Sequence, residues 1–510
     1  MNRIILHPFL VPLFPVFALY LNNLTTLPPA TLGRPLAVLE LISLLAWAGL
    51  SRLFRNTRAA AVMVSLLMFI FFLNRNWGTW EMLAAWLFIA LTLTVEGKQN
   101  PARLAKVSAP LNVVVLTLLL LQAGRYLQSV RHAAFEAGQA AIVTDRQPDK
   151  ESLPNIVHII LDGFGRPDLV KKEFGCDVGF LMDFLNTNGF AVAGHARANY
   201  FQTMQSVAST LSMNYLPGSA ADATRTTPLS RPQLSRVVAA SAVRRELARL
   251  GYRVEGAIAT AYLLSQWNTP EKNKALFNLT EDLLVRKSCL YPLVQRYKKT
   301  HKNAPPPARE AVLRAHYARV RTGFESGAES VRRRAPVYQM LHIVSPHPPF
   351  IFNADGSYRD PGAVDAFIFS DGNHFMQPDD TWATYRTGYS GQVRWAAAET
   401  CRLVERILRE SSRPVVIIIQ GDHGPGLRFN WFSSACDLGN RSGILLAIRL
   451  PDKKPELPEG FQSPVNIYRH LFRELWGADL PLLPTRVIYS TWGKPDVFED
   501  VTAQIEDDPL

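Results

Sequence analysis

Hydrophobic and polar positions divide this chain into two parts of different character. The first quarter carries five long apolar runs with few acidic residues between them, at 4–21, 34–53, 59–74, 79–96 and 109–127. Beyond about residue 150, short apolar runs alternate with amphipathic stretches and turn residues. The pattern predicts a transmembrane domain over 1–127, a linker over 128–153 and a globular domain over 154–510.

The five apolar runs each approach the roughly 20 residues that an α-helix needs to cross a hydrocarbon core. The run at 59–74 is short, and prolines interrupt the run at 4–21. A cleaved signal peptide would explain the first run but not the four that follow. We therefore expect an N-terminal bundle of about five transmembrane helices.

The basic residues of the connecting loops predict how these helices are oriented. The loops after the second and fourth runs carry three basic residues each, whereas the other two loops carry one each; the residues are Arg52, Arg55, Arg58, Lys98, Arg103 and Lys106 against Arg34 and Arg75. Basic loops stay in the cytoplasm. Five crossings then leave the globular domain outside the cytoplasm, so we expect a multi-pass protein of the inner membrane with a periplasmic domain.

The globular part alternates short apolar runs with longer amphipathic stretches at 233–250 and 387–410. This alternation is typical of an α/β fold with a mostly parallel central sheet covered by helices. In such sheets, ligands bind beyond the carboxyl ends of the strands. The predicted strands are Ile156–Leu161, Phe190–Ala193, Arg253–Ile258, Tyr338–Val344, Val415–Gln420 and Gly443–Leu450.

Acidic and imidazole side chains directly follow two of these predicted strands. Asp162 comes after IVHIIL, and Asp422 with His423 comes after VVIIIQG in the sequence GDHGPG. By itself an Asp after a strand is more often a turn residue. The glycines, however, let the backbone bend so that adjacent side chains point at one centre. Two carboxylates and an imidazole suit one divalent ion such as Mn²⁺, Zn²⁺ or Mg²⁺.

Thr203 begins a stretch with helical character that ends at Pro217. Backbone N–H groups at a helix N-terminus favour phosphate oxygens. Coordination to a divalent cation lowers the pKa of a hydroxyl and turns it into a nucleophile. The alternative is that Thr203 only caps the helix.

A further set of polar residues lies near the other strand ends. His347, in LHIVSPHPPF, can hydrogen-bond a phosphoryl oxygen or protonate a leaving group. Arg441 can pair with a phosphate charge, or be a solvated or structural arginine. We interpret His342, inside the apolar run, as a core histidine. Asp371 and His374 are the remaining candidates for a second metal, although we expect a single ion.

Taken together, these elements resemble the alkaline-phosphatase/sulfatase-like superfamily, especially its membrane-anchored branch of lipoteichoic-acid synthases and phosphoethanolamine transferases. The motifs run in the family's order over about residues 154–500, and SPVNIYRHLF resembles the family's closing helix. The resemblance implies a sulfatase-like α/β domain. It also implies a nucleophile at Thr203, a HxPF-like loop at His347, and one metal held by Asp162, Thr203, Asp422 and His423.

Two departures from the family pattern bear on the reaction. The transferase branch typically has Glu at the first ligand position, where Asp162 is more similar to the phosphodiesterase and alkaline-phosphatase side. Thr203 is followed by Met204, Gln205 and Ser206. This sequence lacks the C/S-x-P-x-R motif of formylglycine sulfatases, so a true sulfatase is not expected.

The resemblance implies a phosphoryl-group transferase of the phosphoglycerol or phosphoethanolamine type. Thr203 would attack a membrane phospholipid donor and form a covalent phospho-threonine, and a cell-envelope glycan or lipid would accept the group. With water as acceptor, the same site would be a phosphodiesterase or phosphatase hydrolase. A degenerate, non-enzymatic membrane protein is the third alternative, and the complete ligand set argues against it.

Charge and cysteine content add little to this interpretation. Arginines of cytoplasmic loops and a general attraction to anionic lipid headgroups account for some of the net charge of +12. Without aromatic–basic interleaving or a DNA-binding motif, nucleic acid is not an expected partner. Cys176, Cys289, Cys401 and Cys436 show no CxxC spacing, and both disulfides and free thiols stay open.

Overall fold

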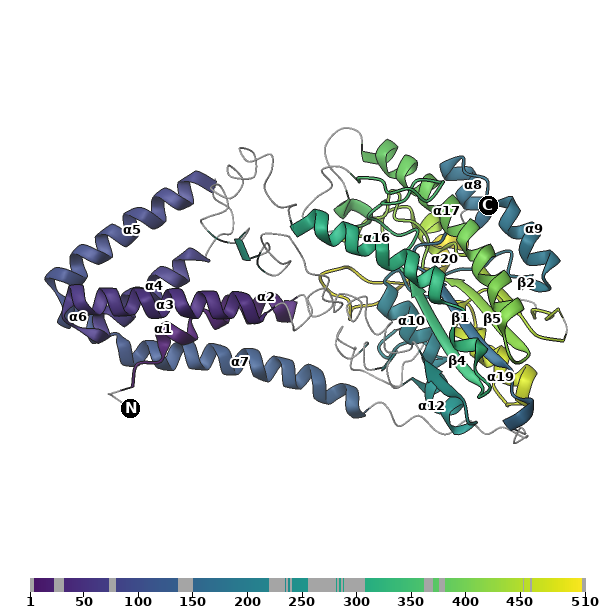
Figure 1. Ribbon diagram of the computed structural model, residues 1–510, viewed down its shortest axis with the longest axis horizontal. Coiled ribbons are helices and arrows are strands. Elements are labelled where there is room, and N and C mark those ends of the chain that lie inside the picture. Colours follow the sequence, from purple (N-terminus) through teal and green to yellow (C-terminus); the bar gives the residue numbers. More distant parts are fainter. Residues whose placement is uncertain are drawn as a thin grey trace. The chain divides into compact units, whose positions relative to one another are not determined.

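The computed structural model divides the chain into two compact units, one of residues 1–129 with 267–312 and one of residues 130–266 with 313–510. Figure 1 traces both units. The residues described are 4–22, 32–72, 79–135, 150–219, 234, 237–238, 241–255, 281, 284–285, 288, 308–361, 370–375, 381–452, 454–458 and 461–506.

The N-terminal unit is helical: the first apolar run is divided between two helices, and each of the other four falls largely within one. Two helical stretches, Gly33–Phe54 and Pro101–Gly124, have the length and composition needed to cross a membrane. The bundle of about five spans stays a prediction, because the other apolar helical stretches among the described residues are shorter, at His7–Leu21, Thr57–Phe71 and Leu87–Glu96. The helices are α1 (His7–Leu10), α2 (Leu13–Asn22), α3 (Gly33–Phe54), α4 (Thr57–Phe71), α5 (Thr79–Gln99), α6 (Pro101–Ala105) and α7 (Ser108–Phe135).

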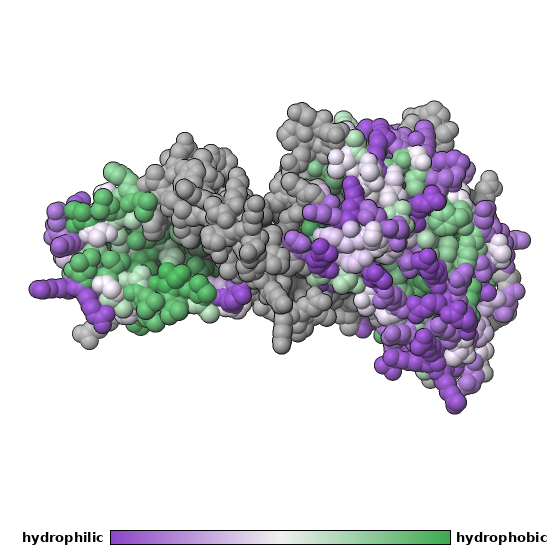
Figure 2. Space-filling model, turned by 45° about the horizontal axis from the view of Figure 1, so that its top comes forward, coloured by the Kyte–Doolittle hydropathy of each residue, from purple (hydrophilic) through white to green (hydrophobic). Residues whose placement is uncertain are grey.

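Within this unit, α4 is packed on several sides while α3 presents apolar side chains outward. Residues 59–64 of α4 are no more than 2% exposed, whereas Leu41 and Leu45 of α3 are 55% and 63% exposed. Figure 2 shows hydrophobic residues over much of the surface of this unit. The predicted linker start at 128 falls inside α7, which continues to Phe135, and residues 136–149 lie outside the described residues.

The second unit is built on a six-stranded sheet in the order β2-β6-β5-β1-β4-β3. β5, β1, β4 and β3 are parallel, and only β6 runs antiparallel to its neighbours. The predicted mostly parallel sheet and its six strands are therefore confirmed. The strands are β1 (Asn155–Leu161), β2 (Phe190–Val192), β3 (Arg253–Glu255), β4 (Val337–Ile343), β5 (Val415–Gly421) and β6 (Leu446–Arg449).

Both faces of the sheet are covered, because successive side chains of a strand point to opposite faces. Ile156 and Ile160 of β1 belong to one apolar cluster, and Val157, Ile159 and Leu161 belong to the other. Helices α10 (Thr203–Ser212), α12 (Ala242–Arg249) and α19 (Ile467–Trp476) pack on the first face. Helices α8 (Pro167–Phe174), α9 (Gly179–Thr187), α16 (Ala308–Ser326) and α17 (Thr381–Glu410) pack on the second.

Several local expectations change in length or state. The helix predicted at 387–410 is the C-terminal part of the longer α17, and the helix predicted over 203–217 ends at Ser212. Cys176, Cys401 and Cys436 are free thiols, while Cys289 lies outside the described residues.

Candidate metal centre and nucleophile

The candidate site lies at the carboxyl ends of three adjacent parallel strands. Asp162 directly follows β1, and Asp422 directly follows β5, with Leu161 paired to Gly421 across the two strands. His342 lies near the end of β4, on the other side of β1. Because parallel strands end at the same edge of a sheet, these side chains converge.

Three atoms of the other predicted ligands lie around His423 Nε2. Its Nε2 lies 3.2 Å from Thr203 Oγ1, 3.4 Å from Asp422 Oδ2 and 3.5 Å from Asp162 Oδ1. Ligand atoms bound tetrahedrally at about 2.0–2.1 Å from zinc stand roughly 3.3–3.4 Å apart. The three distances measured from His423 Nε2 are close to this value.

The hydrogen bonding of the two carboxylates supports a cation here. Asp162 and Asp422 are 2% and 0% exposed. Asp422 Oδ1 accepts a hydrogen bond from the Gly163 backbone N–H at 3.0 Å, but Asp422 Oδ2 and Asp162 Oδ1 have no hydrogen-bond partner. These two atoms are the ones that face His423. Because burying an unpaired carboxylate oxygen is costly, the residues fit a positively charged ligand.

Backbone carbonyls fix the tautomers of two histidines. Nδ1 of His423 lies 3.0 Å from the Gly424 carbonyl, and Nδ1 of His347 lies 2.6 Å from the Pro348 carbonyl. A carbonyl only accepts, so each Nδ1 carries the proton and each Nε2 keeps its lone pair. In His347 the Nε2 lone pair is thus available to a proton or a metal ion, whereas Nε2 of His423 lies within hydrogen-bond distance of Thr203 Oγ1 and Arg441 Nη2.

Thr203 is the first residue of α10, and it does not serve as the helix cap. Gln202 occupies the N-cap position, and its side-chain amide donates to Ser490 Oγ at 2.9 Å. The Thr203 hydroxyl instead contacts His423. The alternative of a simple capping threonine is therefore wrong.

His342 is buried, as its interpretation as a core residue requires, but it also contacts the candidate metal ligands. Its Nε2 lies 3.2 Å from Asp162 Oδ2. Burial alone lowers the pKa of His342, yet the interaction with Asp162 outweighs it and the pKa is raised. Burial likewise raises the pKa of Asp162, but His347, His342 and His423 together hold that pKa well below its usual range.

The sequence did not predict the contact of His342 with Asp162, because the apolar run around His342 indicates a core residue. The signal that could have predicted this contact is a histidine inside an otherwise apolar strand. The possible ligand atoms form two overlapping groups, Asp162 with His347 and His423, and Asp162 with His342 and Asp422. Asp162 is shared by both groups.

Arg441 lies at the site and is not solvated. It is 1% exposed, forms an ion pair with Asp371, and donates to the Gly424 and Phe201 carbonyls at 3.1 Å each. Its Nη2 lies 3.2 Å from His423 Nε2. The sequence thus placed Arg441 near the chemistry but did not predict its partner.

Asp371 is engaged by Arg441 and by Tyr385, whose hydroxyl donates to Asp371 Oδ1 at 2.8 Å. Burial raises the pKa of Asp371, but Arg441 outweighs this effect and the pKa is lowered. His347 Nε2 lies 3.8 Å from Asp371 Oδ2. Asp371 therefore stays ionised beside the site, and the side chain of His374 lies outside the described residues.

The glycines of the two ligand loops are required for different reasons. Gly163 has φ of +77°, a conformation that glycine adopts without strain. In GDHGPG the requirement is space, because a Cβ at Gly424 would lie 2.1 Å from the Asn440 carbonyl oxygen. Close approach to the loop before β6, and not a left-handed bend, explains Gly424.

Comparison with known proteins gives distant likenesses. No family model and no curated protein sequence matches the chain. Among solved structures, the chain is similar to the C-terminal periplasmic domain of EcEptC from Escherichia coli, at 10% identity, covering 71% of this chain and 95% of that one with a TM-score of 0.41.

Two further solved structures are similar to the chain at comparably low sequence identity. The integral membrane lipooligosaccharide phosphoethanolamine transferase A from Neisseria meningitidis is 11% identical, covering 94% of this chain and 95% of that one with a TM-score of 0.40. The phosphonate monoester hydrolase of Agrobacterium radiobacter is 14% identical, covering 68% and 77% with a TM-score of 0.37. At these identities and TM-scores, the likenesses assign no activity to this chain.

Proposed function

We propose that the chain is a membrane-bound, metal-dependent phosphoryl-group transferase that acts on a lipid-linked donor through a covalent intermediate on Thr203. One observation carries this proposal: two buried carboxylate oxygens without partners and the Thr203 hydroxyl surround His423 Nε2. Asp162, Thr203, Asp422 and His423 would hold one Zn²⁺, Mn²⁺ or Mg²⁺. Such an ion supplies Lewis acidity and favours the ionised form of the hydroxyl.

In the first half-reaction, Thr203 Oγ1 bonds to the donor phosphorus, and the bond from phosphorus to the lipid alcohol breaks. Thr203 releases its proton to solvent, and the departing alcohol oxygen takes one from His347. For this transfer His347 enters the step as the imidazolium, with Nδ1–H on the Pro348 carbonyl and a second proton on Nε2, which its 12% exposed side chain can take from solvent.

In the second half-reaction, an acceptor hydroxyl gives its proton to His347 and bonds to phosphorus. The Thr203–phosphorus bond breaks, and Thr203 regains a proton from solvent. Arg441 is held by Asp371 with its Nη2 beside His423, so its charge favours an anionic phosphoryl group nearby.

Two apolar helical stretches support the assignment of a membrane-bound enzyme. A membrane anchor holds the nucleophile within reach of phospholipid headgroups, and a cell-envelope glycan or lipid then serves as acceptor. Hydrolysis is the second candidate, because Asp162 stands where the transferase branch typically has Glu. Water would then replace the acceptor hydroxyl at the same site.

Mass spectrometry of the full-length protein, purified from its own membranes, tests the nucleophile. We expect a phosphate-containing adduct on Thr203, and its mass identifies the transferred group. Ser206→Ala is the matched control, because Ser206 lies on the same helix and donates to Asn199 Oδ1 at 3.0 Å. That variant should keep the adduct, and Thr203→Ala should lack it. An adduct on Ser206 would overturn the assignment.

Labelled membrane lipid separates transfer from hydrolysis. If the chain is a transferase, the label from the headgroup appears on a glycan or lipid acceptor. Label found only in a free, soluble phosphate ester would establish hydrolysis and exclude transfer.

A further inference from the structure

One face of α17 carries three buried polar side chains to which the proposed reaction assigns no step. Tyr385, Tyr389 and Gln392 are separated by four and then three residues, so they lie on the same side of the helix. All three are 0% exposed. Because buried polar groups are normally hydrogen-bonded, the partners of these side chains show what this face of the helix holds.

Tyr389 bonds the loop that follows β1 and carries Asp162. Its hydroxyl donates to the Gly163 carbonyl at 2.9 Å and accepts from the Gly165 N–H at 3.0 Å. Gly163 in turn donates its own N–H to Asp422 Oδ1 at 3.0 Å. Tyr389 therefore fixes the residue that orients one of the proposed metal ligands.

Tyr385 bonds the loop that follows β5, in the sequence GDHGPG. Its hydroxyl accepts from the Gly426 N–H at 2.6 Å and donates to Asp371 Oδ1 at 2.8 Å. Asp371 is also paired with Arg441, whose Nη2 lies 3.2 Å from His423 Nε2. A single hydroxyl thus joins the end of this loop to the carboxylate that holds Arg441.

Gln392 closes the loop that follows β4 and carries His347. Its side-chain N–H donates to the His347 carbonyl at 2.8 Å, and its Oε1 accepts from the N–H groups of Ile351 and Phe352 at 2.8 and 3.1 Å. The His347 N–H donates to the Asp162 carbonyl at 2.8 Å. The loops after β1, β4 and β5 are therefore all bonded to the same face of α17.

A glycine lets α17 approach these loops closely. Gly388 lies on the same face, and a Cβ added there would lie 2.3 Å from the Phe350 ring, in the loop after β4. Glycine is unfavourable inside a helix compared with alanine, so a glycine at this position indicates a packing requirement. The absence of a side chain at Gly388 allows the hydroxyl groups of Tyr385 and Tyr389 to reach the backbone of the loops.

We propose that Tyr385 and Tyr389 are positioning residues, through which α17 holds the loops after β1 and β5 in the arrangement that binds the metal ion. Because this role assumes that the two loops hold a metal, it rests on the proposed function. Neither tyrosine is a proposed ligand, and each acts through the backbone of a ligand loop. Loss of residues that orient metal ligands typically lowers metal affinity by about 10–100-fold.

Tyr389→Phe tests the role of the hydroxyl alone. The ring stays in place against Phe174, whose centroid is 4.4 Å away, while the Gly163 carbonyl and the Gly165 N–H lose their partner. We expect the Kd for Zn²⁺ of the full-length protein in detergent to rise about tenfold, because the backbone that orients Asp422 can then shift. Competition against a zinc-binding dye measures this Kd.

Tyr215→Phe is the matched control, on the other face of the sheet. Tyr215 is 5% exposed, and its hydroxyl donates to the Pro484 carbonyl at 2.8 Å and accepts from the Arg486 N–H at 2.7 Å. The substitution removes the same two kinds of hydrogen bond from a segment that carries no proposed ligand. The two variants should lower the midpoint of urea unfolding of the metal-free protein similarly, but Tyr215→Phe should leave the Kd for Zn²⁺ unchanged.

Tyr385→Phe provides a second variant should Tyr389→Phe not fold. It leaves the Gly426 N–H without its partner, and the Kd for Zn²⁺ should again rise about tenfold. An unchanged Kd in these variants of α17, or an equal rise in Tyr215→Phe, would overturn the positioning role.

The zinc titration also separates this role from the proposed reaction, because it requires no phosphoryl transfer. If the unmodified protein binds Zn²⁺ and Tyr389→Phe binds it more weakly, but no adduct forms on Thr203, the reaction is overturned and the positioning role stands. If the adduct forms and both α17 variants bind Zn²⁺ normally, only the positioning role is overturned. An unmodified protein that binds no Zn²⁺ would overturn both.

Discussion

One helix of each unit departs from the rule that apolar side chains are buried and polar ones exposed. On α3, Leu41 and Leu45 leave more than half of their surface exposed. On α10, Gln205, Ser206 and Thr210 are no more than 1% exposed. The α10 polar groups are paired: Ser206 donates to Asn199, and Gln205 donates to Ser490 at 3.0 Å.

This difference teaches how to interpret exposure and burial. Leucines that face outward along a whole helix indicate a lipid environment, because water would penalise such a surface. Buried polar groups are normally paired, so an unpaired one needs an explanation. In the second unit, Asp162 Oδ1 and Asp422 Oδ2 are unpaired at the same point. The exceptions to ordinary burial thus support a lipid environment for α3 and the proposed metal site in the second unit.

The largest expected effect comes from removing one of these carboxylates. Asp162→Ala should lower metal affinity more than about 100-fold, since loss of an outer-shell partner alone costs about 10–100-fold. The bound metal of the purified protein, measured by mass spectrometry after dialysis, checks this. Asp355→Ala, in a surface turn, is the control and should bind metal normally. A normal metal content in Asp162→Ala would contradict the proposed metal site.

A charged residue on α3 tests the lipid environment inferred from its outward-facing leucines. Leu45→Arg should disfavour membrane insertion of α3 by about 3 kcal/mol, because arginine is costly at the centre of a span. A glycosylation-mapping assay of the inserted fraction measures this. Phe432→Arg, at a side chain that is 65% exposed in the second unit, should change stability by less than about 0.5 kcal/mol. An inserted fraction for Leu45→Arg equal to that of the unmodified protein would contradict α3 as a membrane span.

A smaller effect on metal affinity should follow from replacing His342, which contacts Asp162. His342→Gln removes the contact to Asp162 Oδ2, and we expect a loss of metal affinity of about 10–100-fold. His158→Gln is the control, because His158 is buried in β1 between Tyr468 and Gln420. Metal titration should give one ion per chain in all forms. Two ions per chain, falling to one in His342→Gln, would contradict the single-ion prediction.

The smallest effect concerns His158 itself. Burial lowers its pKa to about 4, below the usual 6.5, so the unfolded chain binds a proton more readily than the folded one. Stability from the neutral residue is complete above pH 6.5 and is lost as the pH falls toward 4, at up to about 1.4 kcal/mol per pH unit. Unfolding of the full-length protein at pH 7, 6 and 5 should show a shallower dependence in His158→Gln. The same pH dependence of unfolding in both proteins would contradict a lowered pKa of His158.

The sequence predicted the strands and the residues at their ends because both depend on local pattern. Short apolar runs identify buried strands, and a parallel arrangement brings their carboxyl ends to one edge. Asp162, Asp422 and His423 therefore came together as predicted. The number of membrane spans could not be decided in the same way, because α4 has only 15 residues and is largely buried within its unit.

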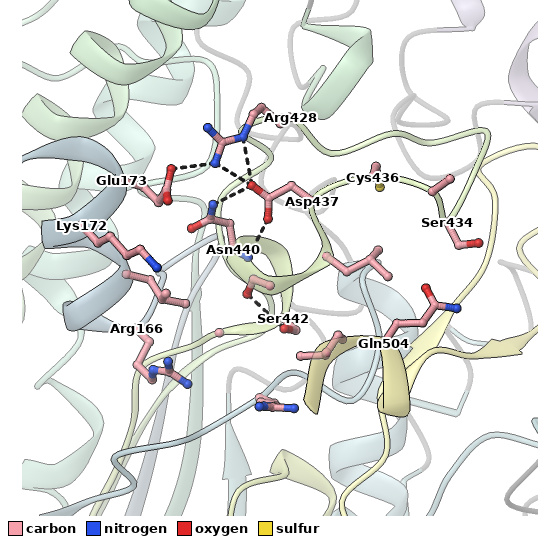
Figure 3. A pocket seen from close by; sticks show the side chains of 17 residues that line it. Arg166, Lys172, Glu173, Arg428, Ser434, Cys436, Asp437, Asn440, Ser442 and Gln504 are labelled. Atoms are coloured by element: carbon pink, nitrogen blue, oxygen red, sulfur yellow. Dashed lines mark hydrogen bonds and ion pairs between the residues drawn. The ribbon is translucent and has the colours of Figure 1, made fainter. Parts of the chain in front are cut away.

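Only the tertiary structure decided which side chains that lie far apart in the sequence contact each other. The pairing of Arg441 with Asp371, and of His342 with Asp162, depends on the sheet order and on how loops cross its edge. One cavity of the second unit is lined by residues of α8, of α18 (Leu438–Ser442) and of α20 (Thr502–Glu506), as Figure 3 shows, and α8 lies more than 250 positions before the other two. Hydrophobic periodicity determines where a strand begins and ends, but packing alone determines which polar atom faces which.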